Sequence, residues 1–280
     1  MYILLQILKL FAKLLVYIVL ILIIVFTTSN IITTPSNTRD WNTDQTTLPY
    51  ADIKGNEITI YNVRNFTYAS TTSFTENYYD KTFDVQKLKR VWYIVEPFSG
   101  IPGSAHTFLS FEFEDNQFVA VSVEIRKEKG ESFHPVKGLF NQYELMYVWG
   151  DEKDLVKLRS NYRKDEVYVY PIKTTEEKAR ALFTDMIART NELYIHPEFY
   201  NTVTNTCTTN IVKHVNEVTP KKIKMINKSV MFPESSDELA YNLGMIDTAL
   251  TFPEARTRFH INEKALKYAD DKDFSTKIRE

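Results

Sequence analysis

The stretch "SAHTFLSFEFEDNQFVAVSVEIRKEKGE", Ser104–Glu131, decides the fold. It holds two runs, His106–Phe113 and Phe118–Arg126, which are rich in β-branched and aromatic residues and are separated by the polar letters EDNQ. Such runs predict two antiparallel strands joined by a tight turn. Similar runs predict further strands at Glu57–Val63, Val91–Phe98, Leu145–Trp149 and Glu166–Ile172.

The turn of this hairpin determines which side chains share a face of the sheet. A three-residue loop, Asp115–Gln117, would set Ser110 opposite Ser122. His106 and Glu124 would then be diagonal neighbours on a partly polar face. A two-residue loop would turn Glu124 to the other face, because side chains alternate along a strand. We favour the three-residue loop, since it gathers the polar residues on one side.

Beyond Pro171 the spacing of apolar residues becomes helical. Thr174–Tyr194 predicts a helix that begins with a capping box of Thr174 and Glu177. A second helix is expected over roughly Asn205–Val218.

The last predicted helix is "SDELAYNLG", capped by Ser236 and stopped by Gly244. The remaining segment, Glu254–Glu280, is charged, and we expect it on the surface. The predicted fold class is therefore α+β, an antiparallel sheet or partial barrel followed by helices.

The N-terminal segment predicts a membrane anchor. Ile3–Thr27 is apolar except for Gln6, Lys9 and Lys13, and is long enough to span a bilayer. The lysines lie on its N-terminal side, which places the N-terminus in the cytoplasm and the rest of the chain outside. No small-residue cleavage site follows Phe26, so we expect a retained anchor rather than a cleaved signal peptide.

The chain thus divides into a transmembrane signal-anchor over residues 1–28, a linker over 29–50 and an extracytoplasmic domain over 51–280. The linker is rich in Thr, Asn, Asp and Pro. Trp41 within it is expected to dock on the domain.

Composition excludes several functional classes. The net charge is −2, so no global basic field points to nucleic acid. Only 7 glycines occur, and no CxxC, HExxH, GxxxxGK or GxSxG motif is present, so we expect no metal and no cofactor. The single cysteine, Cys207, cannot form an internal disulfide. The sequence leaves the oligomeric state open.

Cys207 is the candidate nucleophile. It begins the predicted second helix, where Asn205 or Thr206 can cap. The partial positive charge at a helix N-terminus lowers the pKa of a thiol and favours the thiolate, and its amide groups can stabilise an oxyanion. A lone cysteine is more often an inert buried residue, and the two interpretations have about even weight before a partner is considered.

His106 is the best candidate for the general base among five histidines, because it opens a strand and strands hold side chains in place. His214 lies seven residues beyond Cys207, roughly 10 Å along the helix axis. His134 and His196 precede prolines, and His260 lies in the charged tail.

Glu124 is the candidate that orients His106, on the hairpin register above. Arg126 follows on the same face and is a candidate for substrate binding. The alternative is an exposed ion pair between Glu124 and Arg126, and it has nearly equal weight.

Several motifs, in one order, resemble the Lnb N-terminal periplasmic domain family of bacteria. They are "RDWN", "VRNFTY", "HTFLSFEF", "SVEIRKEKGE", "NQYELMYV", "LRSNYRKDEVYVYP", "NTCTTNI" and "LAYNLGMIDT", and they cover nearly everything from Arg39 onward. The resemblance implies a circularly permuted papain-like or NlpC/P60-like cysteine hydrolase fold, in which the histidine strand precedes the cysteine helix. His106 matches the family's "HT" and Cys207 its "CTT".

The family takes its name from a lipoprotein N-acyltransferase, so the resemblance implies thiol-dependent acyl chemistry. That enzyme has further transmembrane helices, whereas this chain has one at most. The family often has Asn directly before the cysteine, where this chain has Thr206. The thiol chemistry is therefore expected to carry over more safely than the substrate.

Two functions follow as hypotheses. The first is a membrane-anchored, extracytoplasmic cysteine acyltransferase or hydrolase that acts on esters or amides of lipids, lipoproteins or cell-wall peptides. The second is a non-catalytic envelope-binding module with the same fold. The rate at which iodoacetamide labels Cys207 at neutral pH discriminates between them.

Overall fold

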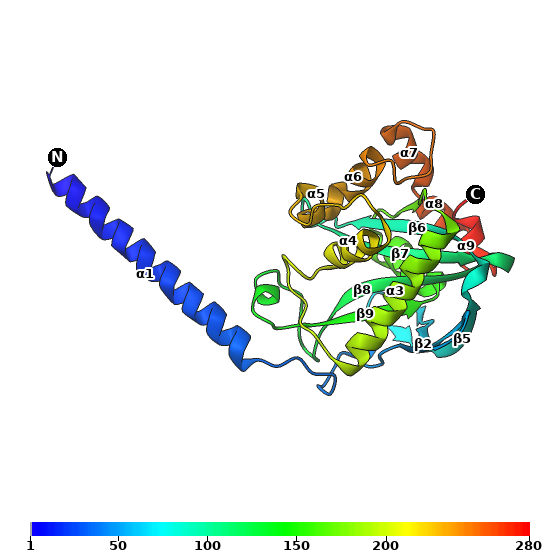
Figure 1. Cartoon of the computed structure of the whole chain (residues 1–280), viewed down its shortest axis with the longest axis horizontal. Coiled ribbons are helices and arrows are strands. Elements are labelled where there is room, and N and C mark those ends of the chain that lie inside the picture. The colour runs from blue at the N-terminus through cyan, green and yellow to red at the C-terminus, as the bar shows by residue number, and fades with distance from the viewer. Residues whose placement is uncertain (1) are drawn as a thin grey trace.

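The computed structural model describes residues Tyr2–Glu280. Helix α1 (Tyr2–Ile32) projects from a folded domain that holds the rest of these residues (Figure 1). The stretch Tyr2–Thr28 is long and apolar enough to cross a membrane, and its most apolar window is not buried against the protein. A core helix of this composition would be buried, so the exposure of α1 supports the predicted anchor.

Eight strands form one sheet, in the order β1-β2-β9-β8-β7-β6-β10, with β5 also paired to β2. Their bounds are β1 (Tyr50–Lys54), β2 (Glu57–Arg64), β5 (Tyr78–Asp84), β6 (Leu88–Pro97), β7 (Ala105–Phe113), β8 (Gln117–Arg126), β9 (Glu144–Gly150) and β10 (Tyr168–Pro171). All pairs are antiparallel except β2 with β9. Two short strands, β3 (Thr67–Tyr68) and β4 (Phe74–Thr75), pair separately.

The β7–β8 hairpin departs from the predicted register by two residues. Its turn is Glu114–Asn116, and Ser110 faces Ala120 rather than Ser122. Asp115 and Asn116 both have positive φ angles, 59° and 54°, which Asp and Asn tolerate better than most residues. The turn therefore closes one residue earlier than predicted. A shift of two residues leaves every side chain on its predicted face.

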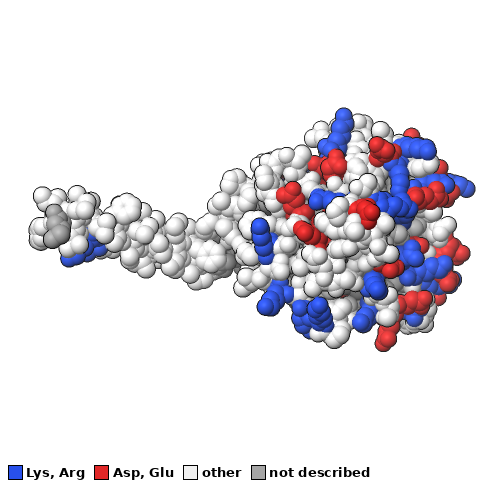
Figure 2. Space-filling view, turned by 90° about the horizontal axis from the view of Figure 1, so that it is seen from above, with Lys and Arg blue, Asp and Glu red and all other residues white. Residues whose placement is uncertain are grey.

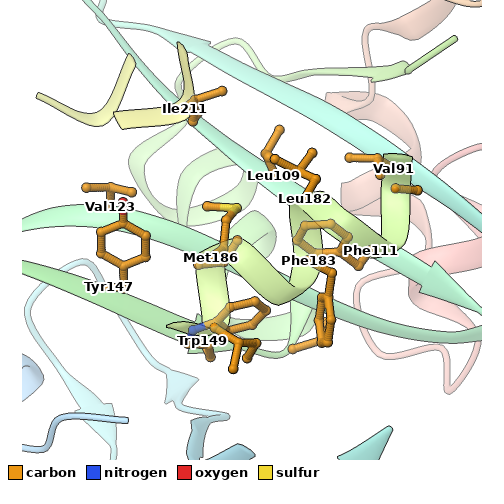
Figure 3. Packing of buried hydrophobic residues seen from close by; sticks show 14 of the residues in the cluster. Val91, Leu109, Phe111, Val123, Tyr147, Trp149, Leu182, Phe183, Met186 and Ile211 are labelled. Carbon is orange, nitrogen blue, oxygen red and sulfur yellow. The ribbon is translucent and has the colours of Figure 1, made fainter. Parts of the chain in front are cut away.

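One face of the sheet packs against helices α3 (Glu176–Ile195) and α4 (Cys207–Val218). Figure 3 shows side chains of both helices meeting side chains of the sheet, with Phe183 and Met186 beside Trp149. The labelled residues of this core, all at most 7% exposed, are Val91, Leu109, Phe111, Val123, Tyr147, Trp149, Leu182, Phe183, Met186 and Ile211. This core fixes where α4, and therefore its first residue, lies over the strands.

The opposite face packs against α2 (Glu152–Lys157), α8 (Asn262–Lys267) and α9 (Phe274–Lys277). The prediction that Glu254–Glu280 lies on the surface is therefore wrong for the apolar residues of this segment. Ile261, Ala265, Phe274 and Ile278 are at most 1% exposed and pack against the sheet. Ile261 with Ala265, and Phe274 with Ile278, are each four residues apart and therefore lie on one face of a helix. The average composition of the segment is charged and does not reveal these buried pairs.

Two predicted caps shift by one residue. The N-cap of α3 is Thr175, whose Oγ1 accepts from the amide of Lys178 at 3.3 Å, and not Thr174. Ser236 is the first residue of α6 (Ser236–Asn242) rather than its cap. Gly244 follows α6 with a φ of 71°, as expected for a residue that ends a helix. Two further helices are α5 (Lys228–Met231) and α7 (Phe252–Phe259).

The linker packs tightly on the domain, and the expected docking of Trp41 is confirmed. Its indole is 4% exposed and lies 4.3 Å from the guanidinium of Arg126. Gln45 is also buried, and its side chain bonds to the backbone of Ile125 and Lys127. The linker thereby covers the end of β8 next to Glu124.

Candidate active site

Cys207 is the first residue of α4. Thr206 occupies the N-cap: its Oγ1 accepts from the amide of Thr209, and the Thr209 hydroxyl accepts from the amide of Thr206. Thr208 ties the helix to the sheet, because its hydroxyl bonds to that of Thr107 on β7 at 2.9 Å. The thiol therefore has a fixed place over the start of β7, at a helix terminus that favours its ionisation.

His106 is the second residue of β7 and is 7% exposed. Its Nε2 lies 2.6 Å from Ser122 Oγ and 3.3 Å from Glu124 Oε1. The Ser122 hydroxyl donates to the same Glu124 oxygen at 2.6 Å. Because Phe108 pairs with Ser122, the observed register brings His106 opposite Glu124 rather than diagonal to it.

The thiol and the imidazole form one electrostatic unit. Burial alone would raise the pKa of Cys207, but the imidazolium of His106, the amide of Thr107 and the hydroxyl of Thr208 lower it to about 7. Burial alone would lower the pKa of His106, but the carboxylate of Glu124 and a hydrogen-bonded thiolate raise it to about 9. Between these two values the thiolate–imidazolium form predominates.

Arg159 forms a buried ion pair with the carboxylate of Glu124. It belongs to a π-helical turn, Leu158–Arg163, and its side chain is 1% exposed. Nη2 lies 2.6 Å from Glu124 Oε1, and Nε lies 2.7 Å from Glu96 Oε2. Burial would raise the pKa of Glu124, but His106 and Arg159 hold it well below its usual range.

Glu96 completes this buried cluster. It is the direct cross-strand neighbour of His106 on β6 and is fully buried. Burial raises the pKa of Glu96, against the attraction of Arg159 and His106. The guanidinium of Arg159 thus joins the two carboxylates that flank the histidine, which stabilises a cluster that would otherwise carry excess negative charge.

A cavity of about 250 Å³ opens above this cluster. Cys207, His106, Glu124 and Arg159 all contribute to its lining, and apolar walls come from Phe98, Phe133 and Tyr200. A thiol, an imidazole and a carboxylate therefore meet at one accessible cavity, and groups of these kinds in such an arrangement can support acyl transfer through a thiol.

Arg126, predicted to bind substrate, lies outside this cavity. It is 2% exposed, and its guanidinium donates to the carbonyls of Gln45 and Thr46 and to the side chain of Asn37. A role in holding the linker fits this position better than substrate binding. The alternative ion pair with Glu124 does not form, since Glu124 faces Arg159 and His106.

The other histidines take different partners. His214 lies on α4 with its ring between Asp185 Oδ2 at 2.6 Å and the hydroxyl of Tyr147 at 2.7 Å. His260 pairs with Glu166, and His134 accepts from the amide of Val136. Within Tyr2–Glu280, no group of three or more His, Cys, Asp and Glu side chains is arranged to hold a metal ion.

Three residues of this cluster, Ser122, Glu96 and Arg159, were not identified from the sequence. Ser122 could have been, because it lies two positions before Glu124 and therefore shares its face. Arg159 carried no such signal: it comes from a separate helical segment, and only the packing of that segment brings it to the sheet.

Comparison with known proteins places the chain within a family. Residues 74–233 match the family described as the Lnb N-terminal periplasmic domain. No curated protein and no solved structure matches the chain. The matched segment covers more than half of the chain and includes His106, Glu124 and Cys207. The chain therefore belongs to the Lnb N-terminal periplasmic domain family.

Proposed function

We propose that this protein is a membrane-anchored thiol enzyme that transfers or hydrolyses acyl groups of esters or amides outside the cytoplasm. The observation that carries the proposal is that Cys207 and His106 line one cavity, where the imidazolium lowers the pKa of the thiol to about 7 while Glu124 and the thiolate raise that of the imidazole to about 9. Inert structural cysteines lie in apolar surroundings, whereas a helix N-terminus and a neighbouring imidazolium are typical of reactive thiols. The order of histidine strand and cysteine helix also supports a permuted papain-like fold.

In the first step the thiolate of Cys207 attacks the carbonyl carbon of the substrate and forms a C–S bond. The carbonyl electron pair moves to oxygen, and the amide of Cys207, which has no helical carbonyl to bond to, is placed to stabilise the oxyanion. Collapse of this intermediate breaks the bond to the alcohol or amine, which takes its proton from the imidazolium of His106. A thioester and a neutral imidazole remain.

In the second step water or an amine attacks the thioester. Neutral His106 accepts the proton of this nucleophile, and the thiolate leaves, which restores the starting ion pair. Glu124 is a positioning residue in both steps, since Ser122 and Glu124 together engage Nε2 of the ring and leave Nδ1 as the second nitrogen. The ring nitrogen Nδ1 then serves Cys207.

The location of the domain limits the classes of acyl compound that can reach the site. α1 would anchor the chain with its N-terminus in the cytoplasm, and the domain would lie in the periplasm or its equivalent. Lipid esters, lipoproteins and cell-wall peptides are the acyl compounds available there. The family resemblance favours acyl chemistry, and the accessible cavity accommodates a carbonyl group beside the thiol.

The pH dependence of alkylation tests the proposal. The full-length protein in detergent should react with iodoacetamide at Cys207 with an apparent pKa of about 7. The variant His106→Ala should shift the apparent pKa of Cys207 toward about 8.5, the pKa of an ordinary thiol. Cys207→Ala provides the unlabelled control.

Mass spectrometry of the protein purified from its own membranes gives the substrate. An acyl adduct on Cys207 would identify the donor, and a fatty acyl or a peptidyl mass would separate lipid from wall chemistry. An ordinary thiol pKa in the first experiment would contradict the enzyme and favour the envelope-binding module.

A further inference from the structure

Exposed apolar side chains gather in loops beside the active-site cavity. Ile101, Val136 and Val203 are each about half exposed, as is Phe232, and Ile226 is 89% exposed. Together with Phe133 they form a set that we call the apolar rim. Large exposed apolar groups in several neighbouring loops mark a surface that meets a partner or a membrane.

The rim flanks the cavity on two sides. On one side Phe133 packs edge-to-face on Tyr200, and both line the cavity with Cys207. On the other side Phe232 lies against Gly103, in the loop that leads into β7 and His106. The rim therefore reaches the cavity of Cys207 through Phe133 and borders the loop before His106 through Phe232.

The rim is continuous with the predicted membrane anchor. Phe26, near the end of α1, makes an edge-to-face contact with Phe140, whose ring centroid lies 6.0 Å away. Phe140 closes the loop that carries Phe133 and Val136. In Figure 1, that loop and α5 both lie on the side of the domain that faces α1, with α4 between them. Figure 2 shows that this end carries less charge than the far end.

The segment Pro220–Phe232 combines apolar and basic residues. It carries Lys221, Lys222, Lys224 and Lys228, and no acidic residue occurs in it. All four lysines are exposed, and within Tyr2–Glu280 no ion pair engages them. Ile226 projects from among them. Lysines around exposed apolar side chains are typical of segments that insert at the surface of an anionic bilayer.

We propose that the apolar rim docks on the bilayer that α1 spans, with Pro220–Phe232 against anionic lipid headgroups and the cavity of Cys207 opening at that surface. This inference rests on the proposed membrane anchorage, and not on the reactivity of the thiol. It places the site where an acyl group of a membrane component enters the cavity without leaving the bilayer. α1 supplies the tether, and the rim sets the orientation of the domain.

Fluorescence depth measurements on the full-length chain test the docking. Single cysteines are introduced by Ile226→Cys, Val136→Cys and Leu266→Cys in a Cys207→Ala background, and each is labelled with an environment-sensitive dye. Leu266 is the matched control, because it is 70% exposed on α8 at the end of the domain away from α1. The chains are placed in vesicles that contain spin-labelled lipid and either anionic or zwitterionic headgroups.

Labels at positions 226 and 136 should be quenched at least about twofold more than the label at 266. Quenching at 226 should be stronger in anionic vesicles, and Lys→Gln changes at 221, 222, 224 and 228 should remove that difference. Equal quenching at all three positions would overturn the proposal and leave a protein partner for the rim. Equal quenching at 226 in the two vesicle types would overturn the preference for anionic lipid.

A second measurement needs no substitution. The unmodified chain in nanodiscs with photoreactive lipid should be labelled within residues 132–140 and 220–232 and not on α8. Labelling confined to α1 would overturn the docking. Because the depth variants lack the thiol, an inert Cys207 would defeat the proposed function and leave this inference intact.

Discussion

Two histidines of this domain are equally buried, each contacts a carboxylate, and their pKa values move in opposite directions. His106 is 7% exposed and its pKa rises to about 9, whereas His214 is 6% exposed and its pKa falls below the usual value. Burial opposes the charged form of both rings. The difference therefore comes from the charges that surround each ring.

His106 faces negative groups: Glu124 and the thiolate of Cys207. Asp185 also favours the charged form of His214, but that carboxylate is 39% exposed. The nearby cations Arg189 and Lys213 lower the pKa of the ring. The net charge of the neighbourhood thus decides whether a buried histidine is a cation. This distinction separates the candidate catalytic histidine from a structural one on α4.

The largest expected effect comes from removing the cation that supports His106. Arg159→Met would leave Glu96 and Glu124 without their buried partner, and should lower the free energy of unfolding by about 3–5 kcal/mol. Arg189→Met, beside His214, is the matched control and should cost about 1 kcal/mol, because Glu192 and Glu198 remain exposed to water. Urea unfolding of the full chain in detergent measures both. Similar losses would show that the two neighbourhoods do not differ.

The next effect concerns the thiol. His106→Asn should raise the pKa of Cys207 from about 7 toward that of a free thiol, and so slow alkylation at pH 6.5 by about 10- to 30-fold. His214→Asn should leave the alkylation rate unchanged, since its ring contacts Tyr147 and Asp185 and not the thiol. Stopped-flow alkylation measures the rates. A comparable loss in both variants would contradict the assignment of His106 as the partner.

A smaller effect is expected from the carboxylates. Glu124→Gln keeps the shape of the side chain but removes the charge that favours the imidazolium, so the thiolate fraction at neutral pH should fall and alkylation should slow by about tenfold. Asp185→Asn makes the same change beside His214 and should have no effect on alkylation. Titration of the histidine ring protons by NMR should show the pKa of His106 falling in the first variant. An unchanged His106 pKa would rule out the positioning role of Glu124.

The smallest effect is the pH dependence of stability. The folded pKa of His214 lies below its unfolded value of about 6.5, so its contribution is present above pH 6.5 and is lost as the pH falls. His106 has the opposite sign: its contribution is present below about pH 6.5 and is lost as the pH rises through about 9. His214→Gln should therefore reduce the loss of stability between pH 7 and pH 5. An unaltered slope in urea unfolding at these two pH values would show that His214 is not the group responsible.

Much of this site follows from local patterns in the sequence. Cys207 was predicted at the start of a helix from a capping residue, Asn205 or Thr206, and the apolar spacing after it, and the structure places it at that position with Thr206 as the cap. The alternation of side chains along β8, together with the preference for a three-residue loop, put Glu124 on the face of His106, and an error of two residues in the register did not change that face. The catalytic roles of these residues stay predictions.

Other features needed the folded chain. The hairpin closed one residue early because two residues of its turn adopt left-handed conformations. The C-terminal segment looked like solvated surface, yet Phe274 and Ile278 complete the second core. In both cases a few residues decided the structure of the segment. Pattern analysis gives every residue of a segment the same weight and therefore missed them.

The sequence by itself determined the helix start at Cys207, the two strands that carry His106 and Glu124, and the apolar N-terminal helix. Only the tertiary structure decided that Arg159 and Glu96 join the cluster, that Arg126 holds the linker, and that His106 and His214 differ in charge. The physical reason is that capping and periodicity act over a few residues along the chain. The charge of a buried group depends on every group within a few ångströms, from whichever segment packing brings there.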